Sequence, residues 1–373
     1  MNRIGFDAKR LFNNFTGLGN YSRTLVKNLM YYHPEYECFL YTPSVQKNQD
    51  TQSFLNNPSY SIQTPGRFEK TGWRSYRVRH QLSRHKIDLY HGLSNEIPLG
   101  LKRKPFPVIV TIHDLIYKHF PKQYPSSDRF FYDQKTRYAC KNSDIVVAIS
   151  ASTKQDLIQF YQVPEEKIKV IYQSCAEHFF QEKSEALIEK ITQKYQLPSE
   201  YMLYVGSITE RKNLLNIIKA MKLLPKDMDL PFVIVGGGKG YKQTVLEYIH
   251  EHQLEQYIHF IQPDNEDLPF IYQKAELFLY PSLFEGFGIP IIEALFSKTP
   301  VITSNCSSMP EAGGPDSFLI NPTDPGEIAY AIDKTLSDSE FRDQMVEKGY
   351  TYAQRFKGEV LTEELVSVYD QLL

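Results

Sequence analysis

The stretch "SLFEGFGIPIIEAL" (residues 282–295) follows the apolar run "AELFLY" and holds two glycines and a proline between two carboxylates. Proline suits the first position of a helix. The pattern therefore predicts a buried strand, a glycine turn that carries Glu285, and a helix that begins at Pro290 and carries Glu293. Such strand–loop–helix units build parallel α/β sheets.

Similar units recur along the whole chain. Short apolar runs alternate with helical patterns from "RIGFDAK" to "VPEEKIKVIYQSC", and again from "YMLYVGS" to "SFLINP". This alternation predicts an α/β protein with two doubly wound, Rossmann-like domains that face each other across a cleft. We expect an N-terminal domain over 1–185, a C-terminal domain over 186–350, and a helix over 351–373 that packs back on the first domain. Ligands should bind at the carboxyl ends of the strands.

The size and charge of the chain agree with two domains. It has 373 residues and a net charge of −2, but residues 1–180 carry +10 (25 Lys and Arg, 15 Asp and Glu) and residues 181–373 carry −12 (17 against 29). The basic half could face an anionic membrane or acceptor, or it could attract the acidic half. Four scattered cysteines, no membrane-length apolar run and no leader-like start predict a cytoplasmic protein.

The glycine turn suits a ligand with both phosphates and hydroxyls. Backbone amides at a helix N-terminus attract anions, and glycines let a ligand approach the backbone. The amides that we expect to face an anion are those of Gly286, Phe287, Gly288 and Ile289. The carboxylate of Glu293 can accept hydrogen bonds from paired hydroxyls. The alternative is a capping loop with Glu293 in an ion pair.

The segment "YVGSITERKNLLNII" (204–218) is a second strand–loop–helix unit. Arg211 and Lys212 precede a helix that Asn213 could cap, and two cations beside helix amides can bind a diphosphate. Gly206 and Ser207 stand at the end of the strand. The alternative is an ordinary solvated charge pair.

Two further segments carry candidate residues in the first half. "FNNFTGLGNYSR" places Gly17 and Gly19 after the first strand, where a helix begins. "VIVTIHDLIYKHFP" places His113 and Asp114 at the end of an apolar strand, which is where sites lie in this architecture. The alternative is that the histidine is structural.

Other patterns argue against some kinds of chemistry. "PFVIVGGGKGY" has Gly236 and Gly238, but Tyr241 stands where a dinucleotide fingerprint needs its third glycine, so hydride transfer is poorly supported. Asp227-Met228-Asp229 has a metal-ligand spacing, but it precedes a strand in a proline-flanked loop. We expect a solvated turn there, no bound metal and no cofactor.

The segment "GWRSYRVRHQLSRHK" (72–86) predicts a basic helix with aromatic residues. It carries Arg74, Arg77, Arg79, Arg84 and Lys86. Such a helix could lie on an anionic lipid surface. It could equally be a solvated helix.

Together, "GSITERKNLL", "EGFGIPIIEA", "TIHDLI" and the Gly17 loop resemble the retaining glycosyltransferase family 4, which has the GT-B fold. The resemblance covers nearly the whole chain, and it implies that residues 1–185 form the acceptor-side domain and residues 186–350 the nucleotide-sugar-binding domain. It implies that Glu293 holds the ribose hydroxyls of a nucleotide-sugar donor, and that Glu285 and the Phe287–Ile289 amides face the sugar and phosphate. It also implies that Arg211 and Lys212 grip the diphosphate, while the Gly17 loop approaches it from the other domain and His113 faces the sugar.

The reaction implied is transfer of a hexose from a UDP- or GDP-hexose to a glycan or lipid-linked acceptor in surface polysaccharide synthesis, with retention and without a metal. "TIHDLIYKHFP" is similar to mannosyltransferases of the family. The chain departs from some members at Ser207, where they carry Arg, and in lacking Trp before the last helix. We expect a cytoplasmic enzyme that can bind peripherally to the inner face of the plasma membrane, with no nucleic-acid partner.

Two other functions fit part of the pattern. A phosphorylase of similar fold would act on a glucan and inorganic phosphate, and bound pyridoxal phosphate would show in its absorbance spectrum. A non-catalytic sugar-nucleotide-binding protein would have been favoured by loss of the Glu285–Glu293 pair or of the cations at Arg211 and Lys212, and all four are present.

Overall fold

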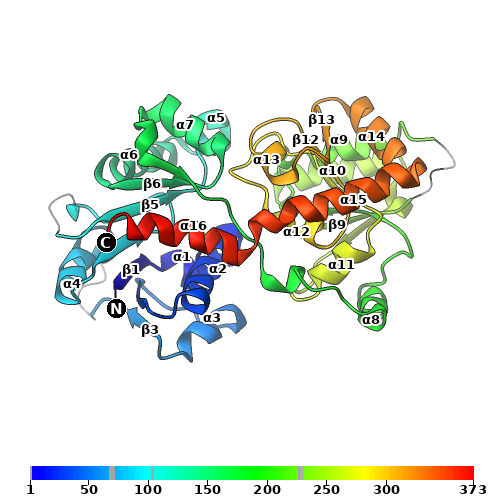
Figure 1. Cartoon of the computed structure of the whole chain (residues 1–373). Helices are drawn as coiled ribbons and strands as arrows, with labels where there is room; N and C mark the ends of the chain where they lie inside the picture. Colours follow the sequence, from blue (N-terminus) through cyan, green and yellow to red (C-terminus); the bar gives the residue numbers. More distant parts are fainter. Residues whose placement is uncertain (1, 67–71, 102–104, 226–227, 229) are drawn as a thin grey trace. The chain divides into compact units, whose positions relative to one another are not determined.

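The structure is a computed structural model that describes residues 2–66, 72–101, 105–225, 228 and 230–373. The chain forms two compact units, of which one consists of Met1–Ser174 with Phe356–Leu373 and the other of Cys175–Arg355. The sequence placed these boundaries after residues 185 and 350. Each unit is an α/β sheet with helices around it (Figure 1).

The first unit contains a seven-stranded parallel sheet in the order β3-β2-β1-β4-β5-β6-β7. All five residues of β5 are buried, because helices cover both faces of a parallel sheet. The half-buried edge strand β3 was not predicted, since its sequence "YSIQ" is mostly polar. The strands are β1 (Arg3–Asp7), β2 (Glu37–Tyr41), β3 (Tyr60–Gln63), β4 (Leu89–Gly92), β5 (Val108–Ile112), β6 (Ile145–Ala148) and β7 (Ile168–Val170).

Helices of the first unit include one that returns from the end of the chain. Leu365, Val366, Val368 and Tyr369 of this last helix, α16, are buried in the core that also holds Leu29 of α2. The helices and helical turns are α1 (Lys9–Asn13), α2 (Gly17–Tyr32), α3 (Gln49–Leu55), η1 (Trp73–Arg77), α4 (Val78–Arg84), α5 (Ile116–His119), η3 (Pro121–Gln123), α6 (Ser126–Asn142), α7 (Ala151–Tyr161), η4 (Glu165–Lys167) and α16 (Gly358–Asp370).

The second unit contains a six-stranded parallel sheet in the order β10-β9-β8-β11-β12-β13. The apolar run before the glycine turn is β11, and all four of its residues are buried, as predicted. The strands are β8 (Met202–Val205), β9 (Phe232–Val235), β10 (Ile258–Ile261), β11 (Leu277–Tyr280), β12 (Val301–Ser304) and β13 (Phe318–Ile320).

Helices of the second unit cover its sheet (Figure 1). The helix after the glycine turn, α12, begins at Ile289, one residue earlier than predicted. Pro290 is therefore its second residue and not its first. The helices and helical turns are η5 (Glu177–Phe179), α8 (Glu185–Tyr195), η6 (Glu210–Lys212), α9 (Leu214–Met221), α10 (Gly240–Glu251), η7 (Glu255–Tyr257), α11 (Leu268–Lys274), α12 (Ile289–Phe296), α13 (Met309–Gly313), α14 (Pro325–Ser337), α15 (Ser339–Ala353) and η8 (Gln354–Phe356).

Both sheets reverse their strand order at one place, between β1 and β4 in the first unit and between β8 and β11 in the second. At such a switch point the connections diverge to opposite faces and leave room for a ligand at the carboxyl ends of the strands. The loops that follow these four strands, and β5 beside β4, carry the candidate residues.

Candidate functional site

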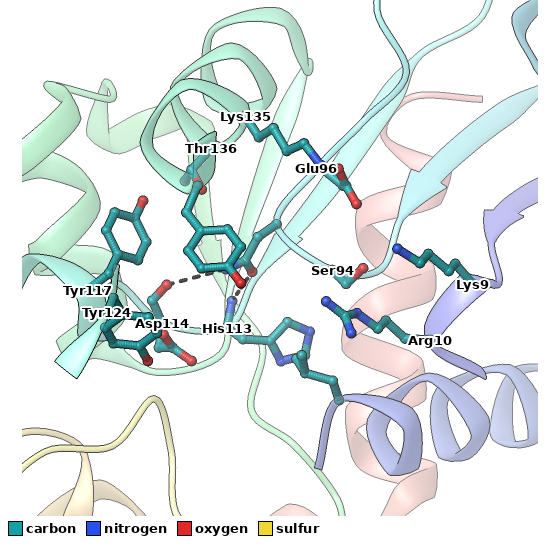
Figure 2. A pocket seen from close by; sticks show the side chains of 13 residues that line it. Lys9, Arg10, Ser94, Glu96, His113, Asp114, Tyr117, Tyr124, Lys135 and Thr136 are labelled. Atoms are coloured by element: carbon teal, nitrogen blue, oxygen red, sulfur yellow. Dashed lines mark hydrogen bonds and ion pairs between the residues drawn. The ribbon is translucent and has the colours of Figure 1, made fainter. Parts of the chain in front are cut away.

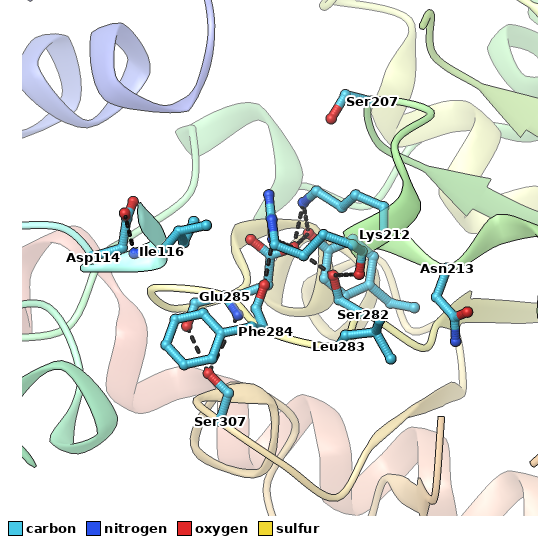
Figure 3. A network of polar contacts seen from close by, with 12 residues as sticks. Asp114, Ile116, Ser207, Lys212, Asn213, Ser282, Leu283, Phe284, Glu285 and Ser307 are labelled. Carbon is cyan, nitrogen blue, oxygen red and sulfur yellow. Dashed lines mark hydrogen bonds and ion pairs between the residues drawn. The ribbon is translucent and has the colours of Figure 1, made fainter. Parts of the chain in front are cut away.

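Glu285 lies against both cations of the loop after β8 (Figure 3). Its Oε1 is 2.6 Å from Arg211 Nη1 and 2.7 Å from Lys212 Nζ. Because β8 and β11 are neighbours at the switch point, their following loops meet. The structure thus brings together three of the residues singled out in the sequence.

Hydroxyl groups complete the surroundings of this carboxylate. Ser282 Oγ donates to Glu285 Oε1 at 2.6 Å, and Tyr280 OH donates to the same oxygen at 3.3 Å. Lys212 Nζ also donates to Tyr280 OH, and Arg211 Nη1 donates to the carbonyl of Phe284. The cations are therefore held in place before any ligand binds.

Burial of Glu285 disfavours its charged form, but the charges of Lys212 and Arg211 outweigh this effect and lower its pKa. The carboxylate is therefore ionised at neutral pH and offsets one of the two positive charges beside it. Guanidinium and ammonium groups such as those of Arg211 and Lys212 can bind a phosphate through short charged hydrogen bonds.

Serines from the loop after β12 fix the glycine turn. Ser307 Oγ donates to the Glu285 carbonyl at 2.8 Å, and Ser308 Oγ donates to the carbonyls of Glu285 and Phe287 at 2.9 and 2.7 Å. Neither serine was predicted from the sequence. Their only signal was the polar run "SNCSSMP" at the end of a predicted strand.

The turn itself leads directly into α12. Gly286 and Phe287 are buried, and Gly288 precedes Ile289 with a φ of 126°, a backbone conformation that favours glycine. The N-terminus of α12 therefore lies close behind Glu285. This placement agrees with the sequence interpretation of the turn, whose ligand role stays a prediction.

Glu293 lies one turn further along α12 and is half-buried. Tyr272 OH donates to its Oε2 at 3.1 Å. Burial raises the pKa of Glu293 to about 7, so both charge states are populated at neutral pH. Among the described contacts, none joins Glu293 with the cluster around Glu285.

Gly206 and Ser207 form the start of the loop after β8. A Cβ atom on Gly236 would lie 1.9 Å from the Gly206 carbonyl oxygen, and one on Gly238 would lie 2.2 Å from the Ile208 carbonyl oxygen. The glycines of "VGGGKG" therefore allow this loop to pack closely. This contact accounts for Gly236 and Gly238 without a dinucleotide.

Asn213 does not cap α9 with its side chain, contrary to the prediction. It has a φ of 61°, and its side-chain Nδ2 donates to the carbonyls of Pro281 and Pro322, at 3.1 and 2.6 Å. Left-handed backbone is tolerated by asparagine. The residue thus ties the cation loop to the loops after β11 and β13.

His113 is buried in the first unit, where its ring is fixed on two sides. Its Nε2 lies 2.8 Å from the Leu93 carbonyl and its Nδ1 lies 3.0 Å from Gln173 Nε2, so Nε2 donates and Nδ1 accepts. Burial lowers its pKa to about 4, which keeps the ring neutral at physiological pH. Asp114 follows, and its Oδ1 accepts from the Ile116 amide at 3.1 Å.

Gly17 and Gly19 lie in the first turn of α2. A Cβ atom at Gly19 would stand 1.7 Å from the Asn14 carbonyl oxygen, whereas a Cβ at Gly17 would meet no atom within 4 Å. Gly19 is therefore required by the packing of the preceding loop. The space at Gly17 is open to a ligand, whose presence stays a prediction.

Two family models match consecutive parts of this chain. The model described as "Glycosyltransferase Family 4" matches residues 15–174, and the model described as "Glycosyl transferases group 1" matches residues 188–352. Together they cover, in order, every strand of both sheets except β1. The chain is a family 4 glycosyltransferase.

Curated relatives and solved structures agree with this assignment. The O-antigen chain mannosyltransferase B of Escherichia coli is 29% identical, over 99% of this chain and 100% of that protein. The serotype-specific mannosyltransferase WbdA of Escherichia coli is 27% identical, over 71% of this chain and 34% of that protein. The crystal structure of Anabaena HepE in complex with UDP-glucose has a TM-score of 0.78 and 16% identity, and each chain is covered completely. The glycosyltransferase therefore has the GT-B fold.

A pocket of about 380 Å³ opens in the first unit of the glycosyltransferase beside His113 and Asp114 (Figure 2). The charged and aromatic side chains around it were not predicted from the sequence. No sequence spacing links the whole set, since they come from α1, α5, α6 and two loops. They are Lys9, Arg10, Glu96, Tyr117, Tyr124, Tyr132 and Lys135.

The basic segment 72–86 is only partly a solvated helix. Arg74 Nε donates to Asp7 at 3.0 and 3.1 Å, Arg74 also pairs with Glu96, and Trp73 is 1% exposed. The interpretation of Arg74 as a lipid-facing cation was wrong, because its side chain points inward to a buried carboxylate. Arg77, Arg84 and Lys86 are exposed.

Two kinds of feature are absent from the described residues. No helix among them is long and apolar enough to cross a bilayer. They contain no group of three metal-ligating side chains of His, Cys, Asp or Glu. Asp227 and Asp229 of the predicted solvated turn lie outside the described residues.

Proposed function

We propose that this glycosyltransferase moves a hexose, and more specifically mannose, from a nucleoside-diphosphate sugar to a glycan or lipid-linked acceptor in surface polysaccharide synthesis. The names of the Escherichia coli relatives support mannose and O-antigen synthesis. The UDP-glucose complex of the Anabaena neighbour supports a nucleotide-sugar donor, UDP- or GDP-linked.

The observation that carries the proposal is the cluster of Arg211, Lys212 and Glu285 at the switch point of the second sheet. When the bond between the anomeric carbon and the phosphate oxygen breaks, negative charge develops on the diphosphate. Preorganised cations stabilise such developing charge without reorganisation. We propose that Arg211 and Lys212 do so, assisted by amides at the start of α12, and that no metal is needed.

Our proposed stereochemical outcome is retention. The acceptor oxygen attacks the anomeric carbon on the face that the diphosphate leaves, and the acceptor proton passes to the departing phosphate oxygen. The transition state has oxocarbenium character. Glu285 supports this route because its Oε1 is already bonded to Arg211, Lys212 and Ser282, which makes it a poor nucleophile.

Other residues would then bind the donor. We propose that Glu293 accepts hydrogen bonds from the ribose hydroxyls, with Gly17 beside the diphosphate and His113 beside the transferred sugar. Because both ring nitrogens of His113 are engaged by the protein, its fixed, neutral ring would contact the sugar through its carbon face or edge and would not act as a cation.

A thermal-shift screen with UDP-, GDP- and ADP-hexoses tests the donor. A ligand that binds only the folded state raises the melting temperature. The donor that does so should then transfer its sugar to a mannose-terminated acceptor, with activity retained in EDTA. Loss of activity in EDTA that Mn²⁺ or Mg²⁺ restores would contradict metal independence. If no nucleotide sugar shifts melting or reacts, the proposed function is wrong.

We also propose that the enzyme works in the cytoplasm, at the inner face of the plasma membrane, through the exposed cations Arg77, Arg84 and Lys86. Each cation near an anionic surface contributes about 1 kcal/mol. Cosedimentation with anionic vesicles at low salt should be weakened by Arg77→Glu with Arg84→Glu, and unchanged by Lys47→Glu with Lys141→Glu, which alters the charge equally elsewhere. If wild-type protein ignores anionic vesicles, the membrane proposal fails.

A further inference from the structure

The pocket in the first unit lies at the carboxyl ends of β1, β4 and β5. Lys9 and Arg10 follow β1 and lie on one side of it, while Tyr117 and Tyr124 lie on the other (Figure 2). The switch point of this sheet lies between β1 and β4, where ligands of such folds bind.

Carboxylates near the pocket are already paired with other cations. Arg74 binds Asp7 through both carboxylate oxygens and also pairs with Glu96. Lys135 Nζ lies 2.8 Å from the other oxygen of Glu96. Asp7 and Glu96 are thus neutralised without help from Lys9 or Arg10, while Asp114, the other carboxylate that lines the pocket, accepts from the Ile116 amide.

Lys9 and Arg10 are left facing the space. Among the described residues, neither the Lys9 ammonium nor the Arg10 guanidinium has an ion pair or hydrogen bond with the protein. Arg10 Nε is buried and has no hydrogen-bond partner. A buried donor without a partner is costly, which favours a ligand that supplies an acceptor.

The electrostatic environment of Lys9 agrees with a need for an anion. Burial lowers the pKa of Lys9, and the neighbouring charges of Arg74 and Arg10 lower it further. Burial and the charge of Arg74 also lower the pKa of Lys135. A bound anion would relieve the mutual repulsion of these cations.

An aromatic wall faces the cations. Tyr132 packs against Tyr117 and Tyr124, with ring centroids 6.0 and 6.3 Å apart. Tyr117 OH is held by Tyr161 OH at 2.5 Å. Aromatic rings offer an apolar body for the face of a sugar and a polar tip for its hydroxyls.

We infer that this pocket binds an acceptor that carries an anionic group, a phosphate or a carboxylate, on Lys9 and Arg10, with its sugar against the tyrosine wall. The inference rests on the proposed glycosyl transfer and assigns the acceptor's chemical class. The anion could belong to a lipid phosphate or diphosphate carrier, or to an acidic sugar of the glycan.

Calorimetry on the full chain can test this with the donor site saturated by the nucleoside diphosphate found in the thermal-shift screen. The probes are citronellyl diphosphate for a lipid carrier, methyl glucuronoside for an acidic sugar and methyl mannoside as the neutral reference. At least one anionic probe should bind at least about tenfold more tightly than methyl mannoside. Arg10→Gln and Lys9→Gln should each weaken that binding by about tenfold. Whichever probe responds identifies the source of the anion.

Lys141→Gln is the matched control, because Lys141 is an exposed cation at the far end of α6 and its loss changes the net charge equally. It should leave anion binding unchanged. Equal binding of neutral and anionic probes, or unchanged binding in both Arg10→Gln and Lys9→Gln with normal melting temperatures, would overturn the inference. So would a loss confined to nucleoside diphosphate affinity, which would assign these cations to the donor. If the neutral and anionic probes bind equally, or if both variants bind normally, the nucleoside diphosphate still binds. Either result would therefore overturn this inference without contradicting the proposed donor function.

Discussion

Arg211 Nη1 lies 2.6 Å from Glu285 Oε1 and so joins the loop after β8 to the loop after β11. Both residues are mostly buried, and the pair closes the switch point of the second sheet. A carboxylate in this position holds the two cations in a fixed geometry. The predictions on Arg211, Lys212 and Glu285 follow from this arrangement.

Arg211→Ala and Lys212→Ala should each lower kcat by about 100-fold, because each removes a preorganised positive charge from the departing diphosphate. Steady-state kinetics with the cognate donor measures this. Melting temperatures should fall only slightly, so that loss of folded protein cannot account for the lower kcat. Wild-type turnover in both variants would show that the diphosphate is bound elsewhere.

Glu285→Gln should reduce the free energy of unfolding at pH 7 by about 2 kcal/mol, since charged hydrogen bonds to two cations are lost. The pKa of Glu285 is lowered in the folded state. Its contribution is therefore present above the unfolded pKa of about 4.3 and is lost as the pH falls through the folded pKa. Urea unfolding of both proteins between pH 3 and 8 should show the difference shrinking in acid. A difference that is constant with pH would contradict the ionised pair.

Glu293→Ala should weaken nucleoside diphosphate binding by roughly 10- to 100-fold, if the carboxylate binds the ribose hydroxyls. With a pKa of about 7, Glu293 should also make binding about tenfold tighter at pH 8 than at pH 6, as it ionises. Glu293→Gln should lack this step and serves as the control for titration of the phosphates. Calorimetry at the two pH values decides between ribose binding and a structural role.

Glu293 should also affect stability, with a pH dependence opposite to that of Glu285. Because the folded pKa of Glu293 is raised, its contribution is complete below the unfolded pKa of about 4.3 and is lost as the pH rises to about 7. The unfolding free energy of the wild type relative to Glu293→Gln should decline over that range. An unchanged difference would show that the folded pKa is not raised.

Tyr369→Phe should destabilise the first unit by about 1–3 kcal/mol. The Tyr369 hydroxyl lies 2.7 Å from Nδ1 of buried His91, whose Nε2 lies 2.8 Å from Thr111 Oγ1. Without the hydroxyl, a buried ring nitrogen on β4 loses its partner on α16. Urea unfolding measures the loss, and Tyr31→Phe, at an exposed tyrosine of α2, is the control. Equal stability of the two variants would show that this bond does not hold the last helix.

The sequence predicted those features that a single segment encodes. Glu285 in a turn after a buried strand, and Arg211 with Lys212 after another, could be assigned to one edge of one sheet because parallel strands end together. The polar edge strand β3 could not be predicted, since nothing in "YSIQ" alternates clearly.

Features that depend on contacts between distant segments were missed or misassigned. Arg74 looked like one cation of a basic helix, but it meets Asp7 from a strand 67 positions earlier. Asn213 looked like a helix cap, and a left-handed backbone conformation turned its amide toward Pro281 and Pro322. In the sequence, Lys9 and Arg10 look like two ordinary solvated cations. The structure sets them apart because the neighbouring cations Arg74 and Lys135 are paired with carboxylates.

NMR-monitored transfer from UDP- and GDP-hexoses to a mannose-terminated acceptor tests the central claim most directly. We predict that one donor gives a glycoside with the anomeric configuration of the donor, releases the nucleoside diphosphate in equal amount, and does so about 100-fold more slowly with Arg211→Ala. An inverted product, or full transfer activity in Arg211→Ala and Lys212→Ala, would contradict the account.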